Sequence, residues 1–125
     1  MSFRRKVFLI CPVRGHDMSE SEAYVKRLEE QGLEVYWPPR DTLQDDETGL
    51  RICQDNLTAI KEAQSVYIVW DGKSQGCLFD LGMAFALGKP VLPLGLPEPT
   101  TTKSFQNMIR AYSAEKVNRN ANELS

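Results

Sequence analysis

Short apolar runs alternate with mixed polar and apolar segments along most of the chain. Four apolar runs predict β-strands, at residues 7–10, 33–37, 65–70 and 91–94. The first run, Val-Phe-Leu-Ile, contains no polar residue, which is typical of a strand covered on both faces of a sheet. Two prolines follow the second run and predict its end there.

Segments with helical spacing separate these runs, at residues 19–31, at a stretch ending near residue 63, at residues 77–87 and at residues 104–112. Ser19 followed by Glu22 has the form of a capping box and predicts a helix start, and Gly32 predicts the end of that helix. In the second helix Ile52, Asn56 and Ile60 share one stripe. Asn56 is the polar residue of this otherwise apolar stripe and therefore needs a separate interpretation.

Turns and a polar tail complete the pattern. Residues 41–47 predict an acidic loop, residues 71–76 a turn rich in Gly, Ser and Asp, and residues 97–102 another loop. Residues 115–117 predict a short edge strand. The polar residues 118–125 are expected to fray.

The alternation of strands and helices predicts an α/β fold. We expect a flavodoxin/Rossmann-like parallel sheet of about five strands in the order 2-1-3-4-5, with right-handed crossovers and helices on both faces. The length of 125 residues fits a single domain spanning residues 1–125.

Composition narrows the class of protein. Hydrophobic residues at 42% and charged residues at 26% are typical of a globular domain. A net charge of -2 argues against a nucleic-acid surface, and no apolar stretch approaches the ~18 residues of a membrane span. The three cysteines are widely spaced and odd in number, which favours reduced thiols and a cytoplasmic protein over a disulfide framework.

In a sheet of this kind a ligand crevice is expected beyond the carboxyl ends of the strands, where the strand order reverses. This places the loops of residues 11–16 and 71–76 together. Arg14 and Gly15 supply a guanidinium and a flexible backbone, and Ser74 with Gly76 supplies a hydroxyl and free N–H groups at a helix start, which suits an anion. The alternative is that both glycines only make turns and Arg14 is solvated.

Asp80 is expected in the first turn of an otherwise apolar helix. One interpretation is an acid that complements the helix dipole; the other is a carboxylate held ionised by the dipole and directed into the crevice, where it stabilises or attacks an oxocarbenium-like centre. Asn56 is either a satisfied core amide or a group that orients a sugar or base. The single histidine, His16, disfavours a histidine-based metal site.

Residues 74–91, Ser-Gln-Gly-Cys-Leu-Phe-Asp-Leu-Gly-Met-Ala-Phe-Ala-Leu-Gly-Lys-Pro-Val, resemble the signature of the nucleoside 2-deoxyribosyltransferase superfamily. The resemblance is greatest to its branch of nucleoside 5'-monophosphate N-glycosidases, which includes 2'-deoxynucleoside 5'-phosphate N-hydrolase. Residues 9–15, 56–63 and 108–110 resemble further segments of that branch.

The resemblance implies a homodimer with shared sites, in which a small nucleotide or nucleoside is cleaved or exchanged at its N-glycosidic bond without a metal or organic cofactor. It implies that Arg14, Ser74 and Gly76 hold a 5'-phosphate, with Gly15 in the same loop. Met108 would reach the partner subunit's site. In addition, Asp80 stands where the family has its helix glutamate, and the family's other acid falls on Asn56.

The first hypothesis for function is therefore hydrolysis of a (deoxy)nucleoside 5'-monophosphate, which releases the base and a sugar 5-phosphate. Asp80 would be the nucleophile or electrostatic stabiliser, and Asn56 would position the sugar or base. The alternatives are a nucleoside 2-deoxyribosyltransferase and a catalytically weakened nucleotide-binding or sensing module. The replacement of two family acids by Asn56 and Asp80 motivates the last of these.

Overall fold

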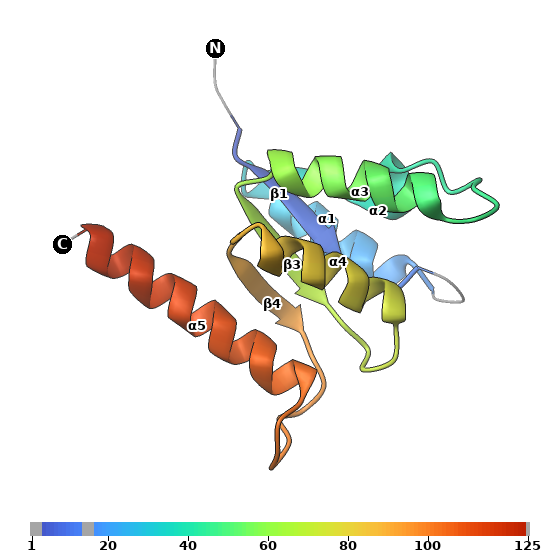
Figure 1. Cartoon of the computed structure of the whole chain (residues 1–125). Helices are drawn as coiled ribbons and strands as arrows, with labels where there is room; N and C mark the ends of the chain where they lie inside the picture. Colours follow the sequence, from blue (N-terminus) through green and yellow to red (C-terminus); the bar gives the residue numbers. More distant parts are fainter. Residues whose placement is uncertain (1–3, 14–16, 125) are drawn as a thin grey trace.

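A computed structural model describes residues 4–13 and 17–124, with side chains through residue 118. Within these residues four parallel strands form one sheet in the order β2-β1-β3-β4. Figure 1 shows β1, β3 and β4 in this sequence. Their bounds are β1 Lys6–Ile10, β2 Glu34–Tyr36, β3 Ser65–Val69 and β4 Val91–Gly95. The predicted α/β class, the parallel sheet and the relative order of these four strands are confirmed.

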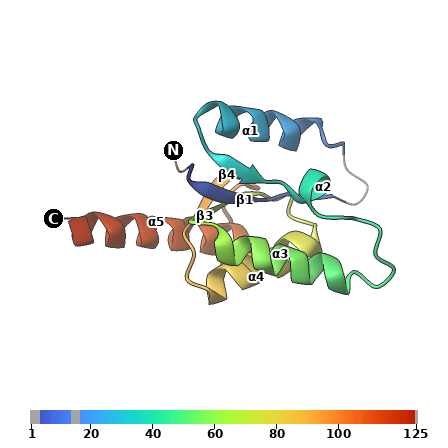
Figure 2. The same ribbon diagram turned by 90° about the horizontal axis from the view of Figure 1, so that it is seen from above.

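In the same part of the chain five helices connect and follow the strands: α1 Ser19–Glu30, α2 Pro38–Asp41, α3 Leu50–Glu62, α4 Gln75–Ala86 and α5 Phe105–Leu124. Figure 2 shows α1 on one side of the sheet and α3 and α4 on the other. The buried Ile109 of α5 packs with the α3–α4 side. The sheet is thus covered on both faces, as the sequence predicts.

Alternation along the strands divides the core into two layers. Phe8 and Ile10 of β1 point toward α3 and α4, whereas Val7 and Leu9 point toward α1, and all four are at most 1% exposed. Successive side chains of a strand point to opposite faces, so a strand buried on both faces consists mainly of apolar residues. This explains the uninterrupted apolar run of β1.

The predicted capping box of α1 does not form. The N-cap residue is Met18, which has no side-chain capping bond, and Ser19 is already inside the helix. Asp17 Oδ1 instead accepts the N–H of Ser19 at 2.9 Å. The carboxylate two residues upstream reaches the free amide first, which leaves the serine hydroxyl without the capping role.

The end of the chain also differs from prediction. Residues 115–117 are part of α5 rather than an edge strand, and the helix continues to Leu124 where a frayed tail is expected. The start of α5 is fixed by the fully buried Ile109 and by Tyr112, whose hydroxyl donates to the Lys89 carbonyl at 2.8 Å. A helix anchored in this way adds one backbone hydrogen bond per residue, and polar residues extend it readily.

None of the helices in the described part of the chain, α5 included, combines the length and the apolar character needed to cross a membrane.

Candidate active site

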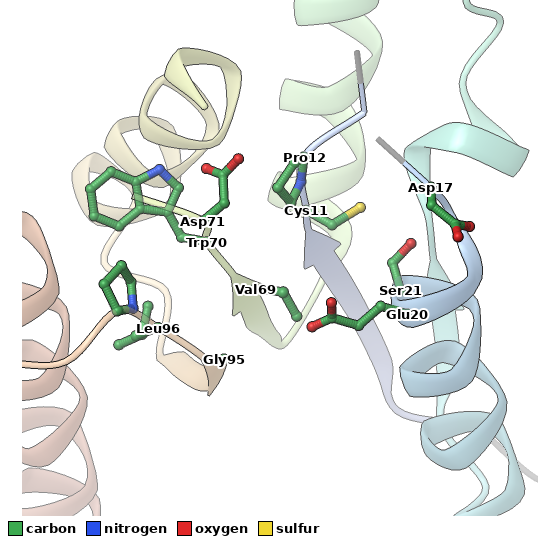
Figure 3. Close-up of a pocket in the computed structure, with 11 residues that line it drawn as sticks. Cys11, Pro12, Asp17, Glu20, Ser21, Val69, Trp70, Asp71, Gly95 and Leu96 are labelled. Atoms are coloured by element: carbon green, nitrogen blue, oxygen red, sulfur yellow. The ribbon is translucent and has the colours of Figure 1, made fainter. Parts of the chain in front are cut away.

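A cavity of about 410 Å³ opens at the carboxyl ends of β1, β3 and β4, beside the amino end of α1 (Figure 3). Its lining consists of Cys11, Pro12, Asp17, Glu20, Ser21, Val69, Trp70, Asp71, Gly95, Leu96 and Pro97. The cavity lies at the point where the strand order reverses, between β1 and β3. The predicted crevice is therefore present, and both predicted loops contribute to its wall.

The described wall of this cavity is acidic. Figure 3 places Asp17 and Glu20 on the α1 side and Asp71 beside Trp70 on the β3 side. No lysine or arginine stands among the described residues that line it. Carboxylates only accept hydrogen bonds when ionised, so this wall suits ligand groups that donate, such as sugar hydroxyls or the amino group of a base.

The amino end of α4 offers a second kind of surface. The helix begins at Gln75, two residues earlier than predicted, with Ser74 as its N-cap, and Ser74 Oγ accepts the N–H of Cys77 at 3.4 Å. Asp71 Oδ1 accepts the N–H of Ser74 at 2.7 Å and so fixes the turn. The exposed Gln75 and Gly76 have no acceptor for their N–H groups among the described residues. Such groups attract anions.

Asp80 and Asn56 are brought together from two helices. Asn56 of α3 is only 5% exposed, and its side chain lies near enough to the carboxyl group of Asp80 on α4 to lower the pKa of that group. Its neighbour Asp55 is exposed and takes no part in this pair. Because the helix starts earlier than predicted, Asp80 lies in its second turn, and the interpretation of Asp80 as a first-turn acid is wrong.

The position of Asp80 changes its expected charge. Burial between α3 and α4 raises its pKa from 3.8 to about 7, and the nearby Asn56 amide opposes this rise. The dipole of α4 therefore does not hold the group fully ionised at neutral pH. A carboxyl group with a pKa near 7 is suited to acid–base or nucleophilic chemistry at that pH.

The three cysteines converge on the same region despite their wide spacing in the sequence. Burial raises the pKa of Cys11, Cys53 and Cys77, and the charge of Asp80 contributes to each rise. For Cys77 the pKa reaches about 12. Cys11 also lines the cavity, whereas Asp80 itself is not among the residues of the cavity wall.

The remaining predicted site residues are not brought to this pair by any contact among the described residues. Met108 is 37% exposed on α5, where its N–H donates to the Ser104 carbonyl. Arg14 and Gly15 lie outside the described residues. No three His, Cys, Asp or Glu side chains within residues 4–13 and 17–118 are arranged to hold a metal ion.

Residues 7–116 match the family model described as nucleoside 2-deoxyribosyltransferase. No curated protein sequence is significantly similar to the chain.

Two solved structures illustrate how widely this fold occurs. A 2-deoxyribosyltransferase from Bacillus psychrosaccharolyticus is 23% identical, with a TM-score of 0.66 over 86% of this chain and 81% of that one. The TIR domain of a Toll-related receptor from Hydra magnipapillata is 16% identical, with a TM-score of 0.59 over 91% of this chain and 95% of that one. At these identities both likenesses describe the fold alone.

Proposed function

The chain belongs to the nucleoside 2-deoxyribosyltransferase family, and from this premise we propose that it hydrolyses the N-glycosidic bond of a nucleoside 5'-monophosphate. In this proposal Asp80 is the catalytic carboxylate, the α4 amino end binds the phosphate, and the products are a free base and a sugar 5-phosphate. The single observation that carries the proposal is the half-buried Asp80 carboxyl group beside Asn56, whose pKa burial raises to about 7.

The spacing along α4 supports this arrangement. Gly76 and Asp80 are four residues apart and share a helix face, and four residues of α-helix rise about 6 Å. This span is comparable with the distance from the 5'-phosphate of a nucleotide to its anomeric carbon. A phosphate on the N–H groups of Gln75 and Gly76 would therefore leave the sugar alongside Asp80.

The chemistry requires the ionised form of Asp80. As the bond from C1' to the base nitrogen breaks, its electron pair leaves with the base and positive charge develops on the sugar ring. The Asp80 carboxylate stabilises this charge or forms a bond to C1'. Water then adds its oxygen to C1', and one of its protons is transferred to the departing nucleobase or to solvent. Where Asp80 has bonded to C1', this addition breaks that bond and regenerates the carboxylate.

The test is release of free base from a panel of ribo- and deoxyribonucleoside 5'-monophosphates, followed by chromatography. We expect base release that increases as the pH is raised through about 7, because Asp80 is then ionised. Asp80→Asn keeps the size of the side chain and is expected to abolish the release. Equal activity in Asp80→Asn, or no release from any member of the panel, would refute the proposal.

Transfer of the sugar to a second base is the other candidate. A solved structure with the same fold is a 2-deoxyribosyltransferase, and the half-buried position of Asp80 limits the access of water to C1'. Incubation with a nucleoside and a different free base distinguishes the two reactions. Exchange of bases faster than net hydrolysis would assign the transferase activity and exclude hydrolysis as the main reaction.

We further propose that the protein is a homodimer through α4 and α5. Large apolar side chains on these helices are exposed: Phe79, Phe85, Phe105, Met108 and Val117. Phe85 and Tyr112 connect the two helices, with ring centroids 4.9 Å apart. An exposed apolar surface of several such residues favours association with a partner, and a second copy would cover Met108.

A further inference from the structure

The strand β2 forms one edge of the sheet. Among the described strands it pairs only with β1. Glu34 N–H donates to the Arg5 carbonyl at 2.9 Å, so Glu34 turns its backbone groups toward β1, and the next residue, Val35, turns its own away from the sheet. A second cavity, of about 370 Å³, is lined by all three residues of β2 and by side chains of α1, α2 and α3. An edge that is open to solvent in this way can pair with a strand of another chain.

Two neighbouring side chains of α2 bind the backbone groups that such a strand would use. Arg40 Nη2 donates to the Val35 carbonyl at 2.8 Å. Asp41 Oδ2 accepts the N–H of Trp37 at 2.8 Å. In a parallel ladder, one residue of an added strand donates its N–H to a carbonyl and accepts from the N–H two positions further along. The Arg40–Asp41 pair makes these same two bonds, at positions 35 and 37.

The Arg40–Asp41 pair is itself held in place. Arg40 Nε donates to Asp41 Oδ1 and Arg40 Nη2 to Asp41 Oδ2, both at 2.9 Å, which is the bidentate geometry of a strong ion pair. The backbone N–H groups of both residues donate to the Trp37 carbonyl, at 2.9 and 2.8 Å, and so return α2 to the end of the strand. Glu29 of α1 accepts from Arg40 Nη1 at 3.3 Å. Three elements therefore fix the pair over the edge.

The opposite edge of the described sheet, β4, is closed in a different way. Pro93 is exposed in the middle of this strand and has no N–H to donate to a further strand. The helix α5 also packs beside β4. Of these two edges, β2 is the one whose outward backbone groups are taken by charged side chains.

We propose that the Arg40–Asp41 pair closes the β2 edge against the addition of a strand from a second copy of this chain. A second copy is the relevant partner because it carries the same edge, and two such edges can pair about a two-fold axis. The strands are then antiparallel, and antiparallel pairing uses the same outward groups of Val35 and Trp37. The proposal rests neither on the proposed function nor on the proposed dimer through α4 and α5.

The experiment measures the self-association of full-length variants by light scattering after size exclusion. All variants are made in a Phe79→Glu background, which places a charge in the exposed apolar surface of α4 and so isolates the sheet edge. We expect Arg40→Ala and Asp41→Ala each to raise the weight-average mass roughly twofold or more, because an added copy at least doubles the particle.

The matched control is Arg51→Ala. Arg51 is an exposed arginine of α3 that donates to the Asp45 carbonyl at 3.1 Å, away from the β2 edge, and its removal should leave the mass of the parent unchanged. In addition, Arg40→Ala and Asp41→Ala change the net charge in opposite directions. Association of both variants would therefore not arise from a change in net charge.

Hydrogen exchange distinguishes pairing at the edge from a general loss of structure. In Asp41→Ala the Trp37 amide is expected to exchange faster in dilute solution and to slow down again as the protein is concentrated, because a second copy then accepts its hydrogen bond. A merely structural defect speeds exchange at every concentration. If neither alanine variant folds, Arg40→Lys keeps the charge but lacks the planar fork, and it should associate in the same way at higher concentration.

Folded Arg40→Ala and Asp41→Ala variants with the same mass as Arg51→Ala, at the highest soluble concentration, would overturn the proposal. A larger particle in which the Trp37 amide stays unprotected would also overturn it, since the copies would then meet at another surface. Where only Arg40→Lys folds, a mass equal to that of the control has the same meaning.

Discussion

Asp80 is a carboxyl group in a half-buried position between α3 and α4, with the Asn56 amide beside it. Removal from water destabilises the charged form of Asp80 more than the nearby Asn56 amide stabilises it. The pKa of Asp80 is therefore near 7 rather than 3.8. The same burial that makes the residue reactive at neutral pH also makes its ionisation unfavourable for folding.

This linkage gives a prediction for stability. The folded pKa of Asp80 lies above its unfolded value, so the folded state holds the proton more tightly, and the free energy of unfolding decreases as pH rises from about 4 to about 7. Asp80→Asn removes the ionisable group, and with it this decrease in the free energy of unfolding. We expect the variant to be a few kcal/mol more stable than the wild type at pH 8, with a much smaller difference at pH 4.

Urea unfolding at the two pH values measures this effect. Asp55→Asn is the matched control, because Asp55 is an exposed carboxylate on α3 next to Asn56. If Asp80→Asn were no more stable than Asp55→Asn at pH 8, the buried ionisation of Asp80 would not be a stability cost.

At the scale of elements, α4 presents two chemical features on one helix. Its amino end has exposed N–H groups at Gln75 and Gly76, and Asp80 follows one turn later. Ser74 is the N-cap at which α4 begins. Its oxygen accepts the N–H of Cys77, and its hydroxyl proton remains available to a ligand. The function of this end as a phosphate site can thus be separated from its role in stabilising the helix.

Ser74→Asp and Ser74→Asn make this separation. Both introduced side chains are good N-caps, so the melting temperature should remain close to that of the wild type. The negative charge added by Ser74→Asp repels a phosphate, and we expect it to raise KM for a nucleoside 5'-monophosphate about tenfold. The neutral Ser74→Asn variant should bind nearly as well as the wild type. Equal KM values for both variants would place the phosphate elsewhere.

At the scale of the whole molecule, the sheet separates the two parts of the site. The acidic cavity has Asp17 and Glu20 on its α1 side, and the Asp80–Asn56 pair lies on α3 and α4. Several exposed apolar side chains, among them Phe79, Phe85 and Phe105, lie on α4 and α5. An assembly through these helices would therefore bury surface close to Asp80 rather than close to the cavity.

Phe79→Glu tests this assembly. Phe79 is 57% exposed on α4, one residue before Asp80, and a charge there should shift a dimer toward monomer in light scattering after size exclusion. Leu43→Glu is the control, because Leu43 is 63% exposed in the segment between α2 and α3. A wild-type protein that is monomeric at micromolar concentration, or a Phe79→Glu variant as dimeric as the control, would contradict the proposed dimer.

Much of the fold is predictable from the sequence because the central strands β1 and β3 are buried on both faces. Such strands consist mainly of apolar residues, and β1 and β3 stand out for that reason. Helix ends are less predictable. Asp17 replaces Ser19 as the acceptor at the start of α1, and α5 continues through residues 115–117 because Ile109 and Tyr112 anchor it. Local patterns do not contain these tertiary constraints.

The sequence by itself determined the parallel α/β sheet, the crevice at its strand ends, and Asp80 and Asn56 as the residues of interest, because periodicity and local motifs encode them. Only the tertiary structure decided that Asn56 lies beside Asp80 and that burial raises the pKa of Asp80. Asn56 and Asp80 lie 24 residues apart on two helices, and the packing of α3 against α4 brings them together. Burial in the folded chain sets this neighbourhood, and sequence spacing does not.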